Sequence, residues 1–169
     1  MITLTDYGFG PNARNQIAAA ADPSPAGAVA ALETFYYALN QRDIEAMAAV
    51  WSPDELAQLN NPVGGILRGG AEAVALYRRI FDSGMRLVTF GDAVTYQQPT
   101  AATFAGREIG TYAAPDRPAT PLEIRTSRFF ATTGPPDAGY NSTTTAASTT
   151  RTRSAPTRTP SQCPHSDRL

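Results

Sequence analysis

The sequence predicts an α+β fold in which three helices pack on one face of a curved antiparallel sheet. Apolar residues recur at helical spacing from Ser24 to Phe81, and the period then changes to two over three long segments. A run of helices followed by a run of strands is typical of this class. A chain of 169 residues has room for one such domain with additional segments.

The helical half begins at Ser24-Pro25, an N-cap followed by proline at the first helical position. We expect the first helix to span about Pro25 to Asn40. Asp43 can cap a second helix, and a third follows the glycine pair at 69–70. Their apolar stripes are, in order, Val29, Leu32, Phe35, Tyr36 and Leu39; Ile44, Met47, Ala48 and Trp51; and Val74, Tyr77, Ile80 and Phe81.

The strands come mainly after the third helix. Alternating segments at Met85–Gln97, Thr100–Tyr112 and Leu122–Thr132 predict three long strands, joined by the turn-like stretches "QQPT" and "AAPDRPAT". A short strand is also expected at Leu56–Asn60, before the turn that Asn-Pro and Gly-Gly mark.

Three regions follow from this pattern. Residues 1–23 have little periodicity and predict a mostly irregular N-terminal arm, residues 24–136 form the domain, and residues 137–169 form a low-complexity tail. We expect the tail to be disordered beyond about Thr149, because it has little apolar surface to bury.

Composition limits the class of partner. A net charge of -1 gives no strong field, so we expect neither nucleic acid nor a membrane as partner. The single cysteine, Cys163, excludes an internal disulfide framework and favours a cytoplasmic location. We expect no metal and no cofactor: His165 is the only histidine, and "GGILRGG" lacks the lysine and the preceding buried strand of a phosphate-binding loop.

Four stretches together resemble a known family. "FYYALNQRDIEAMAAVW", "NNPVGGILRGGAEAVALYRRIF", "FAGREIGTY" and "PLEIRTSRFF" are similar, in this order, to SnoaL-like domains of the superfamily of ketosteroid isomerase and nuclear transport factor two. The resemblance covers about Ala26 to Thr133 and points to a branch of mostly uncharacterised bacterial proteins. It implies a cone-shaped fold, a pocket between sheet and helices, and a homodimer if the sheet is intact.

The resemblance leaves the activity open. It implies a small-molecule-binding or catalytic domain of unknown substrate, or alternatively a non-catalytic binding or dimerisation module. It also places the isomerase's tyrosine donor at Phe35 and its aspartate base at Asn61, where neither side chain can do that chemistry. Tyr36 or Tyr37 could replace the donor, although packing at the helix boundary explains them equally. We therefore expect no ketosteroid isomerase activity by the usual residues.

The candidate pocket contains two charged residues on otherwise apolar strands. Period two places Glu108 with Phe104, and Arg128 with Phe130, on shared faces. If both faces line the concavity, the two charges can pair there or bind a polar ligand. The alternative is an ion pair on the outer face or across a dimer contact. The full set of pocket candidates is Tyr36, Trp51, Asn61, Glu108 and Arg128, with a small apolar or polar-aromatic ligand; Trp51 also fits a core position.

The C-terminal tail contrasts with the family's usual ending, a strand of the form W-x-Q-hydrophobic-H-H-H-G-S-I-D-D-P. Read one nucleotide out of frame, the codons of residues 138–151 can spell W-L-Q-F-H-H-H-G-S-I-D-D-P. This run of matches favours a one-base insertion or deletion near 134–137 that replaced the last strand and impaired the domain. The alternative is a genuine Ser/Thr/Pro-rich linker.

Overall fold

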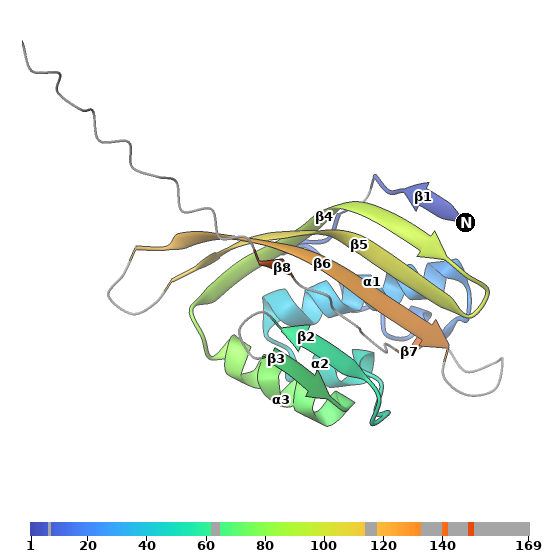
Figure 1. Cartoon of the computed structure of the whole chain (residues 1–169), viewed down its shortest axis with the longest axis horizontal. Helices are drawn as coiled ribbons and strands as arrows, with labels where there is room; N and C mark the ends of the chain where they lie inside the picture. The colour runs from blue at the N-terminus through green and yellow to red at the C-terminus, as the bar shows by residue number, and fades with distance from the viewer. Residues whose placement is uncertain (7, 62–64, 114–117, 133–139, 142–148, 151–169) are drawn as a thin grey trace, which may run out of the picture.

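The computed structural model describes residues 1–6, 8–61, 65–113, 118–132, 140–141 and 149–150. Figure 1 shows a long, curved sheet with helices on its concave side. The strand order of this sheet is β1-β4-β5-β6-β7, with β8 also paired to β6, and all pairings are antiparallel. The α+β cone predicted from the sequence is confirmed.

Helix α1 (Pro25–Gln41) is the long helix that crosses the sheet, and its ends follow from local chemistry. The side chain of Ser24 accepts a hydrogen bond from the Gly27 N–H at the N-terminus. Arg42 ends the helix in the left-handed region, at φ 58°. Asp43 then caps α2 (Ile44–Val50), as predicted, by accepting from two backbone N–H groups. Helix α3 (Gly70–Phe81) completes the helical layer.

The long strands lie close to their predicted bounds. β4 spans Met85–Gln97, β5 spans Ala101–Tyr112 and β6 spans Thr120–Thr132. The small hairpin differs more. β2 spans Gln58–Asn61 and pairs with β3 (Gly65–Arg68), which the sequence interpretation missed because four residues give too little periodicity.

The core lies between α1 and the concave face of the sheet. Aromatic side chains dominate it. Tyr36 of α1 stacks on Phe90 of β4, while the Phe35–Tyr36 and Phe104–Phe130 ring pairs meet edge-on. The largest fully buried side chains are Tyr36, Phe35, Phe90, Phe104, Phe130, Leu32, Met47 and Val50.

Asn40 fixes the distance between α1 and the sheet. The β4–β5 register shifts between Arg86 and Thr89, so Val88 has no partner in β5. The Asn40 amide replaces that partner: its Nδ2 donates to Val88 O at 2.8 Å, and its Oδ1 accepts from Val88 N at 2.8 Å. This contact anchors the helix one turn beyond Tyr36, on the same face.

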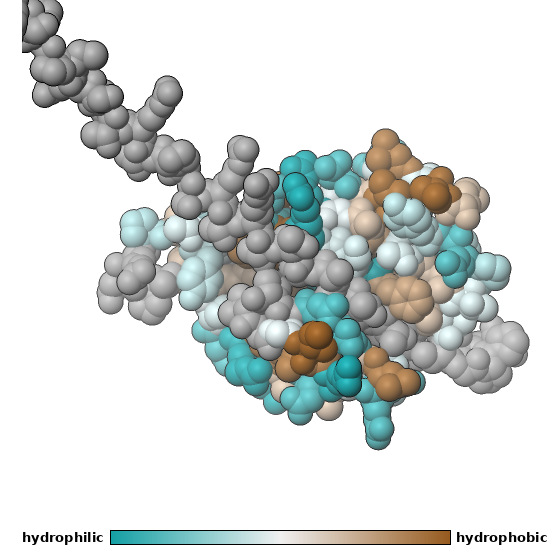
Figure 2. Space-filling view, in the orientation of Figure 1, coloured by the Kyte–Doolittle hydropathy of each residue, from teal (hydrophilic) through white to brown (hydrophobic). Residues whose placement is uncertain are grey.

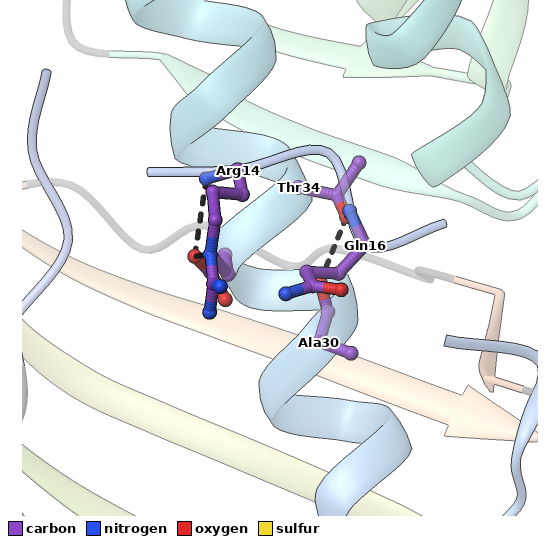
Figure 3. A network of polar contacts seen from close by, with 5 residues as sticks. Arg14, Gln16, Ala30 and Thr34 are labelled. Atoms are coloured by element: carbon purple, nitrogen blue, oxygen red, sulfur yellow. Dashed lines mark hydrogen bonds and ion pairs between the residues drawn. The ribbon is translucent and has the colours of Figure 1, made fainter. Parts of the chain in front are cut away.

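The N-terminal arm is more ordered than its sequence indicated. β1 (Ile2–Leu4) pairs with β4, and the 3-10 turn η1 (Ala19–Ala21) lies against α1. Figure 3 shows the contacts that hold the segment between them: Gln16 N donates to Thr34 Oγ1 at 2.9 Å, and Thr34 Oγ1 donates to Ala30 O at 2.8 Å. Arg14 also contacts Glu33 of α1. These long-range bonds carry no periodic signal, which explains why the sequence suggested only an irregular leader.

The two edges of the sheet differ. At one edge, β1 exposes Ile2 (69%) and Leu4 (76%), and Figure 2 shows brown, apolar surface in that region. At the other edge, β7 (Tyr140–Asn141) and β8 (Thr149–Thr150) pair with β6 at two positions each. The disorder expected beyond about Thr149 falls on residues that, except for Thr150, lie outside the described part of the chain.

The junction of arm and helix gives a first prediction. A Cβ added at Gly27 would lie 1.8 Å from the carbonyl oxygen of Asp22, whereas one at Gly91 would meet no atom within 4 Å. Gly27→Ala should therefore lower the free energy of unfolding by about 1–3 kcal/mol, because the arm must move away from α1. Gly91→Ala, the control, should be neutral or stabilising by about 0.4–1 kcal/mol. Urea denaturation compares them; equal midpoints would show that the arm does not pack against α1.

Candidate functional site

A cluster of three polar side chains lies inside the cone, one each from α1, β5 and β6. The Arg128 guanidinium binds Glu108 Oε1 through one terminal nitrogen at 2.5 Å, and the Tyr36 hydroxyl donates to the same oxygen at 2.9 Å. Glu108 is 7% exposed, Arg128 4% and Tyr36 fully buried. The β5–β6 register places Phe104 opposite Arg128, so the Arg128 stem spans the concave face to reach Glu108 further along β5.

Two aromatic residues support the guanidinium. Its central carbon lies 4.1 Å from the centroid of the Phe35 ring, a cation–π contact inside the core. Tyr77 of α3 packs edge-on against Phe35 with ring centroids 5.5 Å apart, and Trp51 packs against Tyr77 with centroids 6.1 Å apart. Helices α1 and α3 thus form an aromatic wall around the charged pair.

The electrostatics keep Arg128 charged and the two tyrosines near it neutral at neutral pH. Burial is the largest single effect on the pKa of Arg128 and lowers it, but Glu108, Tyr77 and Tyr36 together raise it, and the net pKa lies above its usual range. Burial, reinforced by the Glu108 charge, raises the pKa of Tyr36 well above 10. Burial raises the pKa of Tyr77 to about 12, with the Arg128 cation opposing the shift. Both phenols therefore remain neutral hydrogen-bond donors.

The cluster keeps unused hydrogen-bonding capacity. Among the described residues, Arg128 Nε and Trp51 Nε1 are buried donors without an acceptor. Both hydrogen bonds that Glu108 accepts fall on Oε1, so within the same residues Oε2 accepts none. Buried polar atoms are satisfied in the great majority of structures, so the two unpaired donors stand out as exceptions.

The structure resolves the alternatives for the charged pair. Glu108 and Arg128 form their ion pair in the interior, and Tyr36, rather than Tyr37, faces it. Trp51 is a core residue, 3% exposed, whose ring packs against Tyr77. Asn61 ends β2, where its backbone pairs with Gly65, and its side chain lies outside the described part of the chain.

Two residues of the cluster escaped the sequence interpretation. Phe35 cannot donate a hydrogen bond, yet its ring lies against the Arg128 guanidinium. Tyr77 was assigned only to an apolar stripe, although a tyrosine buries its ring with a polar tip that needs a partner. The phenol of Tyr77 was the one signal in the sequence that could have pointed to the cluster. Nothing in the sequence pairs it with Arg128, which lies three strands further along the chain.

Within the described residues, no group of three or more histidine, cysteine or acidic side chains is placed to hold a metal. In the same part of the chain, no helix is both long and apolar enough to cross a membrane. His165 and Cys163 lie outside the described residues.

The opposite face of the sheet carries a second polar feature. A shallow hollow of about 560 Å³ is lined by both signs of charge, with Arg107 contacting Asp92 at 2.9 Å and Glu123 at 3.2 Å. The pKa of Arg107 is raised. The hydrogen bond to Glu123 is the largest cause, and the charges of Asp92 and Glu123 add to it. Arg125 stands directly opposite Arg107 in the β5–β6 register and forms no ion pair within the described residues. Like charges in that position repel, so the acids beside Arg107 stabilise the arrangement.

Solved structures share this fold at low sequence identity. A candidate calcium/calmodulin dependent protein kinase II association domain from Xanthomonas campestris superposes with a TM-score of 0.62 at 13% identity, covering 79% of this chain and 91% of that chain. A nuclear transport factor 2-like superfamily protein from Salmonella enterica serovar Typhimurium gives 0.60 at 12%, covering 76% and 92%. An LEH-like epoxide hydrolase from M. tuberculosis gives 0.51 at 17%, covering 71% and 77%.

Sequence comparison identifies the family. A search of curated proteins finds no match. The family model of the SnoaL-like domain, however, matches residues 29–134, a stretch that contains most of α1, all of α2, α3, β4, β5 and β6, and the interior cluster. Since this match covers more than half of the chain, the protein belongs to the family of SnoaL-like domains.

Proposed function

We propose that this SnoaL-like domain binds, and in an intact form transforms, a small apolar or polar-aromatic molecule at the interior cluster. The observation that carries the proposal is the buried Glu108–Arg128 pair, which keeps free hydrogen-bonding atoms among aromatic side chains. A buried ion pair is a poor source of stability, because well-packed apolar residues often serve the fold as well or better. Apolar walls with a few convergent polar groups are typical of ligand sites.

The chemistry available is that of a neutral, preorganised polar centre. Tyr36 stays protonated and donates its one proton to Glu108, while Arg128 is a permanent cation that holds Glu108 as its counter-ion. Such an arrangement can orient a ligand oxygen or stabilise charge that develops on it. The solved epoxide hydrolase with this fold supports an enzymatic role, and the substrate class remains a proposal.

We also propose that the domain is impaired by a frameshift before its last strand. β7 pairs Asn141 with Ala131. In a frame-restored variant, a strand continuing this antiparallel register would face Arg128 three positions after Asn141. The middle histidine of the shifted reading falls at that position. The restored strand would thereby add a titratable side chain beside Glu108 and Arg128, which the Thr-rich tail does not supply.

The outer face supports a second candidate function, dimerisation. An isologous contact brings the same patch of two copies together, so it must be self-complementary. The hollow at Asp92, Arg107, Glu123 and Arg125 holds two cations and two anions, and Arg125 has no ion-pair partner within one copy's described residues. The guanidinium of Arg125 can therefore reach an acid of the second copy.

The binding proposal is tested with adjacent tyrosines. Tyr36→Phe removes the hydroxyl on Glu108, whereas Tyr37→Phe, the matched control, alters a half-buried tyrosine outside the cluster. In a thermal-shift screen with small neutral aromatic compounds, ligands should raise the melting temperature of wild type and control. For Tyr36→Phe the affinity should fall about tenfold, because Glu108 and Arg128 lose the hydroxyl that orients them. Equal affinities in both variants would place binding elsewhere.

The frameshift proposal is tested by expressing the chain with the other frame restored after Gly134. A complete strand would pair along the edge of β6, where β7 and β8 occupy four positions. Covering that edge should raise the melting temperature by several degrees, since each 1 kcal/mol is worth about 2–8 °C in domains of this size. Differential scanning calorimetry on both chains provides the measurement. Equal stability would mean that the tail is a genuine element and that no frame was lost.

The dimerisation candidate is tested with charge reversals. Arg125→Glu should weaken self-association at least tenfold, because it places a third acid in the hollow. Arg79→Glu makes the same change on the exposed surface of α3, far from the hollow in sequence, and should leave association unchanged. Sedimentation equilibrium of the frame-restored chain gives the dissociation constants. A monomer in every case would exclude this interface.

A further inference from the structure

The N-terminal arm contacts the interior cluster at the ring of Tyr36. Among the described residues, three rings meet that of Tyr36: Phe35 and Phe90, with centroids 5.1 and 4.9 Å away, and Phe9 of the arm at 6.4 Å. Phe35 and Phe90 are fully buried, whereas Phe9 is half-buried. Of these neighbours, Phe9 is therefore the one that lies between Tyr36 and solvent.

Backbone contacts hold Phe9 in this position. It forms an isolated antiparallel bridge with β4: Phe9 N donates to Phe90 O at 2.9 Å, and Phe90 N donates to Phe9 O at 2.7 Å. Gly8 permits the close approach, because a Cβ there would lie 2.9 Å from Phe90 O. Further along the arm, Gln16 N binds the Thr34 hydroxyl on α1 (Figure 3). Residues 8–16 thus run as a strap from the side of β4 to the helix.

The strap is itself weakly buried. No described residue from 1 to 19 is buried, and the arm packs on the core through three half-buried apolar side chains, Phe9, Ala13 and Ile17. In its ion pair with Glu33, the Arg14 side chain is 75% exposed, so water screens the attraction. Segments with few buried apolar contacts open locally, at a lower free energy than that of global unfolding.

We propose that residues 8–16 are a strap that opens independently of the domain, and that Phe9 is the plug that closes the interior cluster to solvent. Release of the strap uncovers Tyr36, whose hydroxyl meets the buried ion pair at Glu108. The family match begins at residue 29, so the strap lies outside it. The role of the strap in ligand access rests on the proposed binding function, whereas its opening is a property of the chain alone.

Amide hydrogen exchange of the full chain, followed by NMR, tests whether the strap opens. Phe90 and Val88 form a matched pair in β4: the Phe90 N–H bonds to the strap, and the Val88 N–H bonds to Asn40 of α1 at 2.8 Å. A local opening frees the amides of Phe9 and Phe90 together, so their protection factors should be at least tenfold lower than that of Val88. Equal protection of Phe90 and Val88 would mean that the strap leaves only when the whole domain unfolds, which would overturn the inference.

Acetylation by N-acetylimidazole tests the role of Phe9. Labelling of Tyr36, located by tandem mass spectrometry, should be severalfold faster in Phe9→Ala, because the ring that covers it is removed. Gly8→Ala keeps that ring but pushes the arm away from Phe90 O, so it should also accelerate labelling. Phe129→Ala, the control, truncates another half-buried phenylalanine, on the outer face of β6, and should label at the wild-type rate.

The outcomes separate the strap from the function beneath it. Unchanged labelling of Tyr36 in either strap variant, or an equal rise in Phe129→Ala, would overturn the assignment of Phe9 as the plug. Both measurements are made without a ligand, so they succeed or fail independently of binding. If ligands bind although the strap stays closed, the inference fails and the proposed function stands. If the strap opens and no ligand binds, the proposed function fails and the strap stands.

Discussion

The buried ion pair between Glu108 and Arg128 is the constraint on which the arrangement of the interior depends. Removing one partner of such a pair leaves an uncompensated charge and typically costs about 3–5 kcal/mol. The pair is held from three directions: Tyr36 donates to the carboxylate, Phe35 lies under the guanidinium, and the β5–β6 register sets the spacing. Consecutive residues of α1 thus serve opposite charges, which fixes the rotation of the helix over the sheet.

The position of α1 is fixed independently at its C-terminal end. Asn40 satisfies both backbone groups of Val88, where the shift in the β4–β5 register removes the strand partner. The bulge and the amide are complementary, since either one alone would leave buried polar groups unpaired. Together with the arm bound through Thr34, they hold α1 over its length and preorganise the Tyr36 hydroxyl.

The two faces of the sheet divide the candidate roles. The concave face holds one paired charge system within aromatic walls, the environment in which a few polar atoms determine which ligand binds. The convex face exposes the charged side chains of Asp92, Arg107, Glu123 and Arg125. Water screens these ion pairs, so they add little to stability and contribute mainly to the specificity of a contact with another protein surface. Because strand residues alternate between faces, β5 supplies Glu108 inward and Arg107 outward from adjacent positions.

The sequence by itself determined the elements whose signals are local. The Ser24-Pro25 cap, the stripe through Phe35 and Tyr36, and the period-two strands predicted α1 and β4 to β6 within two residues, because capping and periodicity depend only on near neighbours. It also placed Glu108 and Arg128 on one face each, but left open whether those faces looked inward. Only the tertiary structure decided this, together with the strand β3, the packing of the arm on Thr34 and the contacts of Phe35 and Tyr77 with the cluster. Strand β3 was too short for periodicity to reveal it, and the other features join residues separated by about 20 to 90 positions. No local pattern encodes which distant charge a ring or a backbone group will meet.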